Sequence, residues 1–263
     1  MDFTRMAWTW EPDTFAAHWF DEGNDRMPAP LRYRSRFPTV GGFEAHRAAV
    51  RAGADTDERE RIGLLVHTLA HCDMRIEIRF GSVKHRGGDG HTRKDLRVVG
   101  ARTYAHAVVL SQTAVRGEDS DIRAQLLRAD QLPAALAAAL PPCEPGRDKP
   151  VTFDLADVQA AKEAGFSVQD TRSPRGRFAQ LARRPADGGG QAILRLGNFH
   201  AAPNRHRVLQ WGDFTGDGRY VEQRNRTHLE LRPATAQGLI AIFAGWIDQA
   251  ERTLREEAED AYY

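Results

Sequence analysis

Two histidines with a metal-binding spacing, His67 and His71, are separated by Thr-Leu-Ala, and Cys72 follows directly. On a helix this i, i+4 spacing places both imidazoles on one face, where they could bind zinc. The glutamate that follows the first histidine in zinc proteases is replaced here by Thr68. We therefore interpret the pair as one turn of a half-buried helix and predict no metal. A metal-dependent hydrolase is the weaker alternative, and it predicts stoichiometric zinc.

The sequence Asp-Phe-Thr-Gly-Asp-Gly at residues 213–218 imitates the start of a calcium-binding loop. The twelfth position of such a loop is a bidentate glutamate, and here it is Arg224. We interpret the segment as a tight hairpin between two strands.

Glycine clusters at residues 87–90 and 188–190 lack the spacing of phosphate-binding loops, so we predict flexible loop tips. The sequence contains no Gly-x-Ser-x-Gly nucleophile motif.

Arginines are dense between residues 172 and 184, where no acid interrupts them: Arg172, Arg175, Arg177, Arg183 and Arg184. Such a group could bind phosphate. We favour an exposed strand face, because the whole chain carries a formal charge of only +1. An anion-binding or nucleic-acid-binding protein that uses this stretch remains the leading alternative.

The chain has 263 residues, of which 41% are hydrophobic and 28% charged, as in an ordinary soluble globular protein. The near-neutral charge argues against a strongly basic nucleic-acid wrapper and against an acidic tail protein. The two distant cysteines do not make a disulfide framework. The first residues lack the apolar core of a signal peptide, and the longest apolar stretch, 132–142, is too short to span a membrane. We expect a cytoplasmic protein.

Hydrophobic periodicity assigns the elements that position these residues. In residues 74–80, Met74, Ile76 and Ile78 alternate with charged residues, which is typical of a half-buried strand. The pattern predicts helices over residues 12–22, 58–71, 131–140 and 155–164 and from 233 onward. It predicts further strands over 96–99, 105–111, 122–127, 151–153, 178–182, 192–196, 208–211, 220–223 and 228–231; residues 33–57 read as short helix or loop.

Grouped strands indicate an α+β protein with an antiparallel sheet. The Pro-rich segment 141–150 is the best linker candidate, so we divide the chain into halves 1–145 and 146–263 of one continuous domain. Each half runs helix, strands, helix, and the stretches from Ile122 and from His228 both read as a strand followed by a helix rich in Ala and apolar residues. We infer a duplication related by a pseudo-twofold axis.

Several segments carry a family resemblance: Trp-Glu-Pro-Asp-Thr-Phe-Ala-Ala-His-Trp-Phe-Asp-Glu-Gly at 10–23, Met-Pro-Ala-Pro-Leu at 27–31, Gly-Asn-Phe-His-Ala-Ala-Pro at 197–203, and residues 208–221 and 229–235. With this order of segments, the chain resembles the EspG family, the cytoplasmic chaperones of actinobacterial type VII (ESX) secretion. The resemblance implies a central antiparallel sheet flanked by two helical parts with quasi-twofold symmetry. It also implies no enzymatic activity and no cofactor.

The resemblance further implies binding to the helical tip of a PPE protein in a PE–PPE heterodimer. The chaperone would mask an apolar patch, keep the substrate soluble and direct it to its own ESX system. Residues 33–57 have no clear counterpart in the family, and the stretch 172–184 is more basic than the family pattern. Because family members outside mycobacteria can lack a conventional PE–PPE partner, another helical type VII substrate is the alternative client. Trp211 and Tyr220 are assigned to the sheet core. The expected contact surface is the sheet, the carboxy-terminal helical part and the loop 82–95, with these partner-binding residues: His85, Arg86, His91, Arg93, Phe199, Asn204, Arg205 and His206. The alternative to partner binding is that each of these residues belongs to the ordinary surface, or, for Phe199, to the core.

Overall fold

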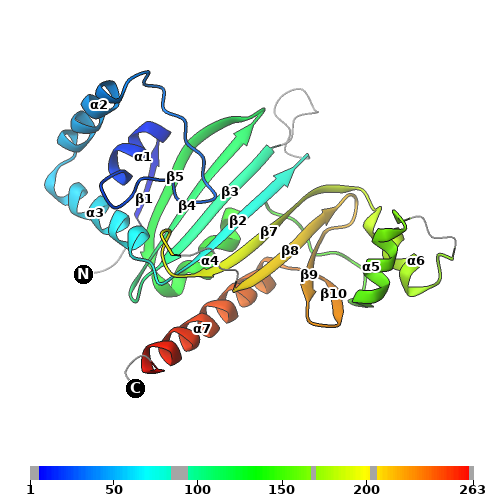
Figure 1. Ribbon diagram of the computed structural model, residues 1–263. Coiled ribbons are helices and arrows are strands. Elements are labelled where there is room, and N and C mark those ends of the chain that lie inside the picture. Colours follow the sequence, from blue (N-terminus) through cyan, green and yellow to red (C-terminus); the bar gives the residue numbers. More distant parts are fainter. Residues whose placement is uncertain (1–5, 84–93, 167–169, 202–205, 261–263) are drawn as a thin grey trace.

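One antiparallel sheet runs through the whole chain (Figure 1). The computed structural model describes residues 6–83, 94–166, 170–201 and 206–260. Within these ranges the sheet has ten strands in the order β1-β5-β4-β3-β2-β7-β8-β9-β10-β6. Their bounds are β1 Met6–Trp10, β2 Met74–Ser82, β3 Lys94–Arg102, β4 His106–Val115, β5 Glu118–Arg128, β6 Val151–Asp154, β7 Ala186–Leu196, β8 Arg207–Phe214, β9 Arg219–Arg224 and β10 His228–Pro233.

The helices begin where the sequence supplies capping residues. Side chains of Thr39, Asp55, Asp154 and Ser173 accept hydrogen bonds from the first turns of four of them. The bounds are α1 Pro12–Trp19, α2 Val40–Gly53, α3 Thr56–Ala70, α4 Leu132–Ala139, α5 Leu155–Glu163, α6 Pro174–Ala182 and α7 Ala236–Asp260. None of the described helices is both long and apolar enough to cross a membrane.

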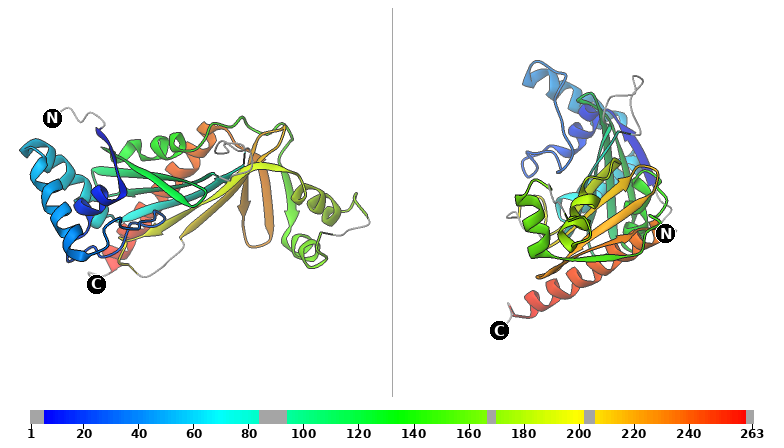
Figure 2. Two further views of the ribbon diagram at one scale, coloured as in Figure 1. Left: turned by 90° about the horizontal axis from the view of Figure 1, so that it is seen from above. Right: turned by 90° about the vertical axis from the view of Figure 1, so that its right-hand side faces the viewer.

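Helices cover the two faces of the sheet differently (Figure 2). On one face α4 and α7 pack over the centre, where Leu136 and Phe243 join the apolar side chains of β2 and β7 in one buried cluster. On the other face, α1 and α3 cover the β3–β5 end with Trp19 and Leu65. At the far end, α5 and α6 pack on β6, β9 and β10 around Phe153. None of the helices in the described residues lies over the centre of this second face (Figure 1).

The sheet confirms the inferred duplication. From the central β2–β7 ladder outward, the first half continues β3, β4, β5, β1 and the second half β8, β9, β10, β6, which is the same order. The helical insertions are also equivalent, since α1–α3 precede β2, α5–α6 precede β7, and α4 and α7 each follow the last hairpin of their half. At the middle of the central ladder Ile78 pairs with Ala192. The division into halves 1–145 and 146–263 stays a prediction, although one sheet joins them.

Most predicted elements are confirmed, and Trp211 and Tyr220 are buried in the sheet core as predicted. One predicted strand is wrong: residues 178–182 form the end of helix α6. Ser173 caps this helix, Pro174 occupies its first turn, and Phe178 packs edge-on against Phe153 with the ring centroids 5.3 Å apart. In the ambiguous stretch 33–57 the structure places α2, and β1 is a strand that the sequence analysis did not assign.

The linker candidate 141–150 is tied to β9. Its Gly146 N donates to the Arg219 carbonyl at 3.0 Å, and Arg219 N donates to the Glu144 carbonyl at 2.7 Å. The Asp148 amide donates to the Tyr220 hydroxyl at 2.8 Å. The segment that connects the halves therefore extends the packing of the second half.

The glycines at 188–190 are also not a flexible loop tip, because they lie inside strand β7. Glycine is required at these positions of β7 because the neighbouring strands leave no room for a side chain. A Cβ atom on Gly190 would lie 2.6 Å from the Arg79 carbonyl oxygen and 2.7 Å from the Trp211 ring. We expect Gly190→Ala to lower the free energy of unfolding by about 1–3 kcal/mol, as overpacking does. Urea denaturation followed by circular dichroism measures this.

Gly63 is the matched control, because a Cβ there meets no atom within 4 Å on the exposed side of α3. We expect Gly63→Ala to raise the free energy of unfolding by about 0.5–1 kcal/mol, since alanine is the better helix former. If both variants changed stability in the same direction, the packing argument at Gly190 would be wrong.

Neither Cys72 nor Cys143 forms a disulfide, and the two cysteines differ in environment. Burial raises the pKa of the Cys72 thiol to about 12. Because the thiolate is the reactive form, we expect Cys72 to resist thiol reagents in the native protein, while the half-buried Cys143 reacts. Titration with Ellman's reagent before and after unfolding checks this. Fast reaction of Cys72 in the native state, located by peptide mapping, would contradict it.

Candidate functional site

The centre of the sheet presents an uncovered surface, which we call the open face (Figure 1). It lies opposite α4 and α7, between α1–α3 on one side and α5–α6 on the other. Successive residues of a strand point to opposite faces of the sheet, so every second residue of each strand lies on the open face. From β2, β3, β7 and β8 the side chains on this face include Arg75, Glu77, Arg79, Asp95, Arg97, Gln191, Ile193, Arg195, Val208 and Gln210.

A buried ion-pair network forms the middle of the open face. Glu77 accepts from Arg75 Nε at 3.1 Å and from Arg195 Nε at 2.9 Å, with one carboxylate oxygen shared between them. The Arg75 and Glu77 side chains are only 7% and 8% exposed. Arg75 also donates to the carbonyls of Gly197 and Asn198, at 2.7 and 2.6 Å. The network therefore ties β2 of the first half to β7 and to the turn after β7.

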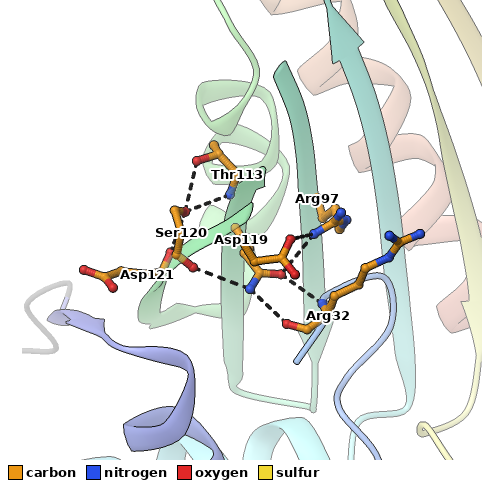
Figure 3. Close-up of polar contacts among 7 residues, drawn as sticks. Arg32, Arg97, Thr113, Asp119, Ser120 and Asp121 are labelled. Atoms are coloured by element: carbon orange, nitrogen blue, oxygen red, sulfur yellow. Dashed lines mark hydrogen bonds and ion pairs between the residues drawn. The ribbon is translucent and has the colours of Figure 1, made fainter. Parts of the chain in front are cut away.

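A second polar cluster anchors an extended segment, residues 27–37, which we call the strap (Figure 3). The buried Gln112 of β4 accepts from the Arg32 amide and donates to the Arg32 carbonyl, both at 2.9 Å. Arg97 donates to the same amide oxygen at 3.4 Å and forms an ion pair with Asp119. Ser120 accepts from the Thr113 amide at 3.1 Å beside a register shift in β4.

Directly after Arg32, the strap is held by α1. The buried Asp13 accepts from the Tyr33 hydroxyl at 2.8 Å and from the Ser35 hydroxyl at 3.1 Å. Burial is the largest cause that raises the pKa of Tyr33, which reaches about 12, and Asp13 adds to it. The backbone of Arg32 is therefore fixed while its side chain is exposed.

Between the strap and the central strands lies a cavity of about 300 Å³, which we call the arginine pocket. Arg32 of the strap lines it together with Arg79 of β2 and Arg97 of β3, which are direct partners in the β2–β3 ladder. Its full lining is Arg32, Arg79, Phe80, Gly81, Asp95, Leu96, Arg97, Gly189, Gly190 and Gln191.

The structure places only part of the predicted binding residues. Six of the eight lie outside the described residues: His85, Arg86, His91, Arg93, Asn204 and Arg205. Phe199 is half-buried and packs edge-on against Trp19, with the ring centroids 6.0 Å apart, while Arg75 lies 5.0 Å from its ring. His206 is half-buried at the start of β8, where burial and Arg207 lower the pKa of its imidazole. A partner-binding role for these residues stays a prediction.

The alternatives from the sequence find little support in the described part of the chain. His67 and His71 stack with their centroids 4.3 Å apart, and no third potential ligand joins them among the described residues. The hairpin that imitates a calcium loop uses its acids for ion pairs, since Asp213 binds Arg219 at 2.7 Å and Asp217 binds Arg184.

The arginine stretch 172–184 does not form an exposed strand face. Residues 174–182 are helical, and Arg184 is committed to Asp217 and Asp148 and stacks 4.6 Å from the Phe214 ring. Arg172, Arg177 and Arg183 remain exposed.

Comparison with known proteins gives one informative match. The sequence model described as "EspG family" matches residues 11–241. No curated protein matches the chain significantly. Two crystal structures of HtdX from Mycobacterium tuberculosis are 12% and 13% identical, cover 88% and 87% of this chain and 99% and 98% of theirs, and give TM-scores of 0.18 and 0.19.

A putative thioesterase II from Thermobifida fusca is 10% identical, covers 65% of this chain and 84% of its own, and gives a TM-score of 0.19. Such low structural scores support no conclusion about fold or activity. The family match, in contrast, covers most of the 263 residues. The chain therefore belongs to the EspG family, whose members are ESX-associated secretion chaperones and not enzymes.

Proposed function

We propose that this chain is a cytoplasmic chaperone that binds the helical tip of a PPE-like protein in a PE–PPE heterodimer, or another helical type VII substrate. It keeps this client soluble and directs it to its ESX system. The observation that supports the proposal best is the open face, a sheet surface without helical cover between two helical parts. A sheet surface that lies between two helical parts suits the end of a helical hairpin.

The predicted contact residues are consistent with this surface by position. The described strand ends that flank residues 84–93 are those of β2 and β3, and Gly81 and Asp95 at these ends line the arginine pocket. Phe199 follows β7 and touches Arg75 of the open face. We propose that the client contacts the open face and both of these connections.

Co-expression tests the proposal. The chain, with an affinity tag, is produced together with the PE- and PPE-like or other helical type VII proteins encoded nearest its gene. We expect one client to co-purify in a fixed ratio by size-exclusion chromatography with light scattering, and to be insoluble when produced alone. Failure of every such neighbour to bind would refute the function and leave the fold unaffected. Binding to a DNA duplex that weakens steeply with salt would then favour the anion-binding alternative.

A further inference from the structure

We infer that the client inserts a carboxylate, from an aspartate or glutamate of its helical tip, into the arginine pocket between Arg32 and Arg79. The inference rests on the proposed function, because it specifies the chemistry by which the open face recognises its client.

The first observation is the state of the two arginines. Arg79 is exposed although it lies in the middle of the sheet, and Arg32 is exposed on the strap. Within the described part of the chain, neither guanidinium has a carboxylate within ion-pair distance, whereas Arg97 beside them is paired with Asp119. The carboxylate that lines the pocket is Asp95. Two guanidinium groups are thus available at one hollow to bind an anion.

The second observation is the origin of the hollow. Gly81 of β2 pairs directly with Gly189 of β7, and both positions belong to the open face by alternation. Without side chains, this pair leaves a depression next to Arg79. A Cβ on Gly189 would lie 2.9 Å from the Trp211 carbonyl oxygen, so the close strand spacing also keeps this position small. The depression has room for the end of a short acidic side chain.

The third observation is the polarity of the surrounding surface. Val208, which is 45% exposed, is the one large hydrophobic residue of the open face that is strongly exposed among the described residues. A purely apolar client surface would remove Arg79 and Arg32 from water without a partner, which is costly. A client that brings carboxylates gains charge-assisted hydrogen bonds instead, often bidentate with arginine. The open face therefore selects for an acidic client tip.

The mixed charges of the open face argue against a nucleic acid as its ligand. Glu77 and Asp95 interrupt the arginines, and Glu222 of β9 lies on the same side of the sheet. A phosphate backbone needs a continuous track of cations. A single carboxylate needs only the two guanidinium groups of the arginine pocket.

The test compares charge reversals on the two faces of the sheet. Arg79→Glu and Arg32→Glu alter the pocket, and Arg123→Glu is the control, because Arg123 is exposed on β5 and points to the opposite face. Affinity for the client obtained by co-expression is measured by isothermal titration calorimetry. We expect each pocket variant to bind about 10- to 100-fold more weakly and the control to bind within about twofold of the wild type.

Two further variants test the inference. Arg79→Ala should weaken binding less than Arg79→Glu, and melting curves establish that each variant is folded. Replacing an acidic residue of the client tip by lysine should restore binding to Arg79→Glu.

The outcome for the wild type separates the inference from the proposed function. If the wild type binds the client and the reversals at Arg32 and Arg79 leave the affinity unchanged, only this inference fails. If the wild type binds no client, the proposed function fails first and the inference with it. Binding of a DNA duplex that Arg79→Glu abolishes would assign the pocket to phosphate and overturn the carboxylate.

Discussion

Replacement of Glu77 by alanine is expected to lower the free energy of unfolding by about 3–5 kcal/mol, a large part of what a domain has. The reason is that Glu77 is the shared partner of Arg75 and Arg195 in the middle of the open face. Its loss leaves two guanidinium groups, 7% and 16% exposed, without the carboxylate that binds them. Chemical denaturation with a fixed m-value measures the change.

The conservative variant and an exposed pair provide the controls. Glu77→Gln keeps the shape and one acceptor, so we expect a smaller loss than for Glu77→Ala. Arg26→Ala breaks the pair with Asp25, whose side chain is 73% exposed, and should change stability by less than about 1 kcal/mol. If Glu77→Ala cost no more than Arg26→Ala, the network would not hold the central ladder.

Gln112→Ala is the second substitution with a large expected effect, about 2–4 kcal/mol. The amide of Gln112, which is 1% exposed, satisfies both the N–H and the carbonyl of Arg32, and it also accepts from Arg97. Each buried polar group that loses its partner costs about 1–3 kcal/mol. We therefore expect the strap to detach at Arg32 while Asp13 still holds Tyr33 and Ser35.

Hydrogen exchange separates this local effect from general destabilisation. In Gln112→Ala the amide of Arg32 should lose its protection, while amides in the central β2–β7 ladder keep theirs. Ser111→Ala, one residue earlier and on the opposite face of β4, is the control and should leave the Arg32 amide protected. If client binding survived in Gln112→Ala with the strap detached, Arg32 would not need its fixed position.

The prediction of elements from the sequence worked where a local pattern was sufficient. Alternation in β2 and the capping residues of α5 are local signals, and both elements form as predicted. The segment 174–182 misled because its arginines suggested an exposed strand, although Ser173 followed by Pro174 is a helix-start signal. Strand β1 also had a readable pattern, with Met6, Trp8 and Trp10 alternating with small residues.

The candidate surface is harder to predict because it depends on pairing across the chain. The alternation in β2 predicts that its charged residues face solvent, which is correct for Arg79 and wrong for Glu77. Glu77 is buried because β7, far away in sequence, brings Arg195 beside it. No local sequence pattern predicts that these two side chains form an ion pair. The arginine pocket likewise needs the strap to cross β4, and a single buried amide, Gln112, specifies that crossing.

The near-twofold arrangement of the sheet has a consequence for the orientation of the client. A rotation of 180° about an axis through the centre of the β2–β7 ladder exchanges the two strands. The backbone of the sheet therefore looks the same to a ligand in either of two opposite orientations. Centred on the pair Ile78 and Ala192, the equivalent positions on the open face are Glu77 with Gln191 and Arg79 with Ile193. At each pair one half carries a charge and the other does not. If the proposed client binds the open face, we expect these unequal pairs to set the direction in which a two-helix ligand lies across the sheet, and we expect exchange of their side chains to reverse it.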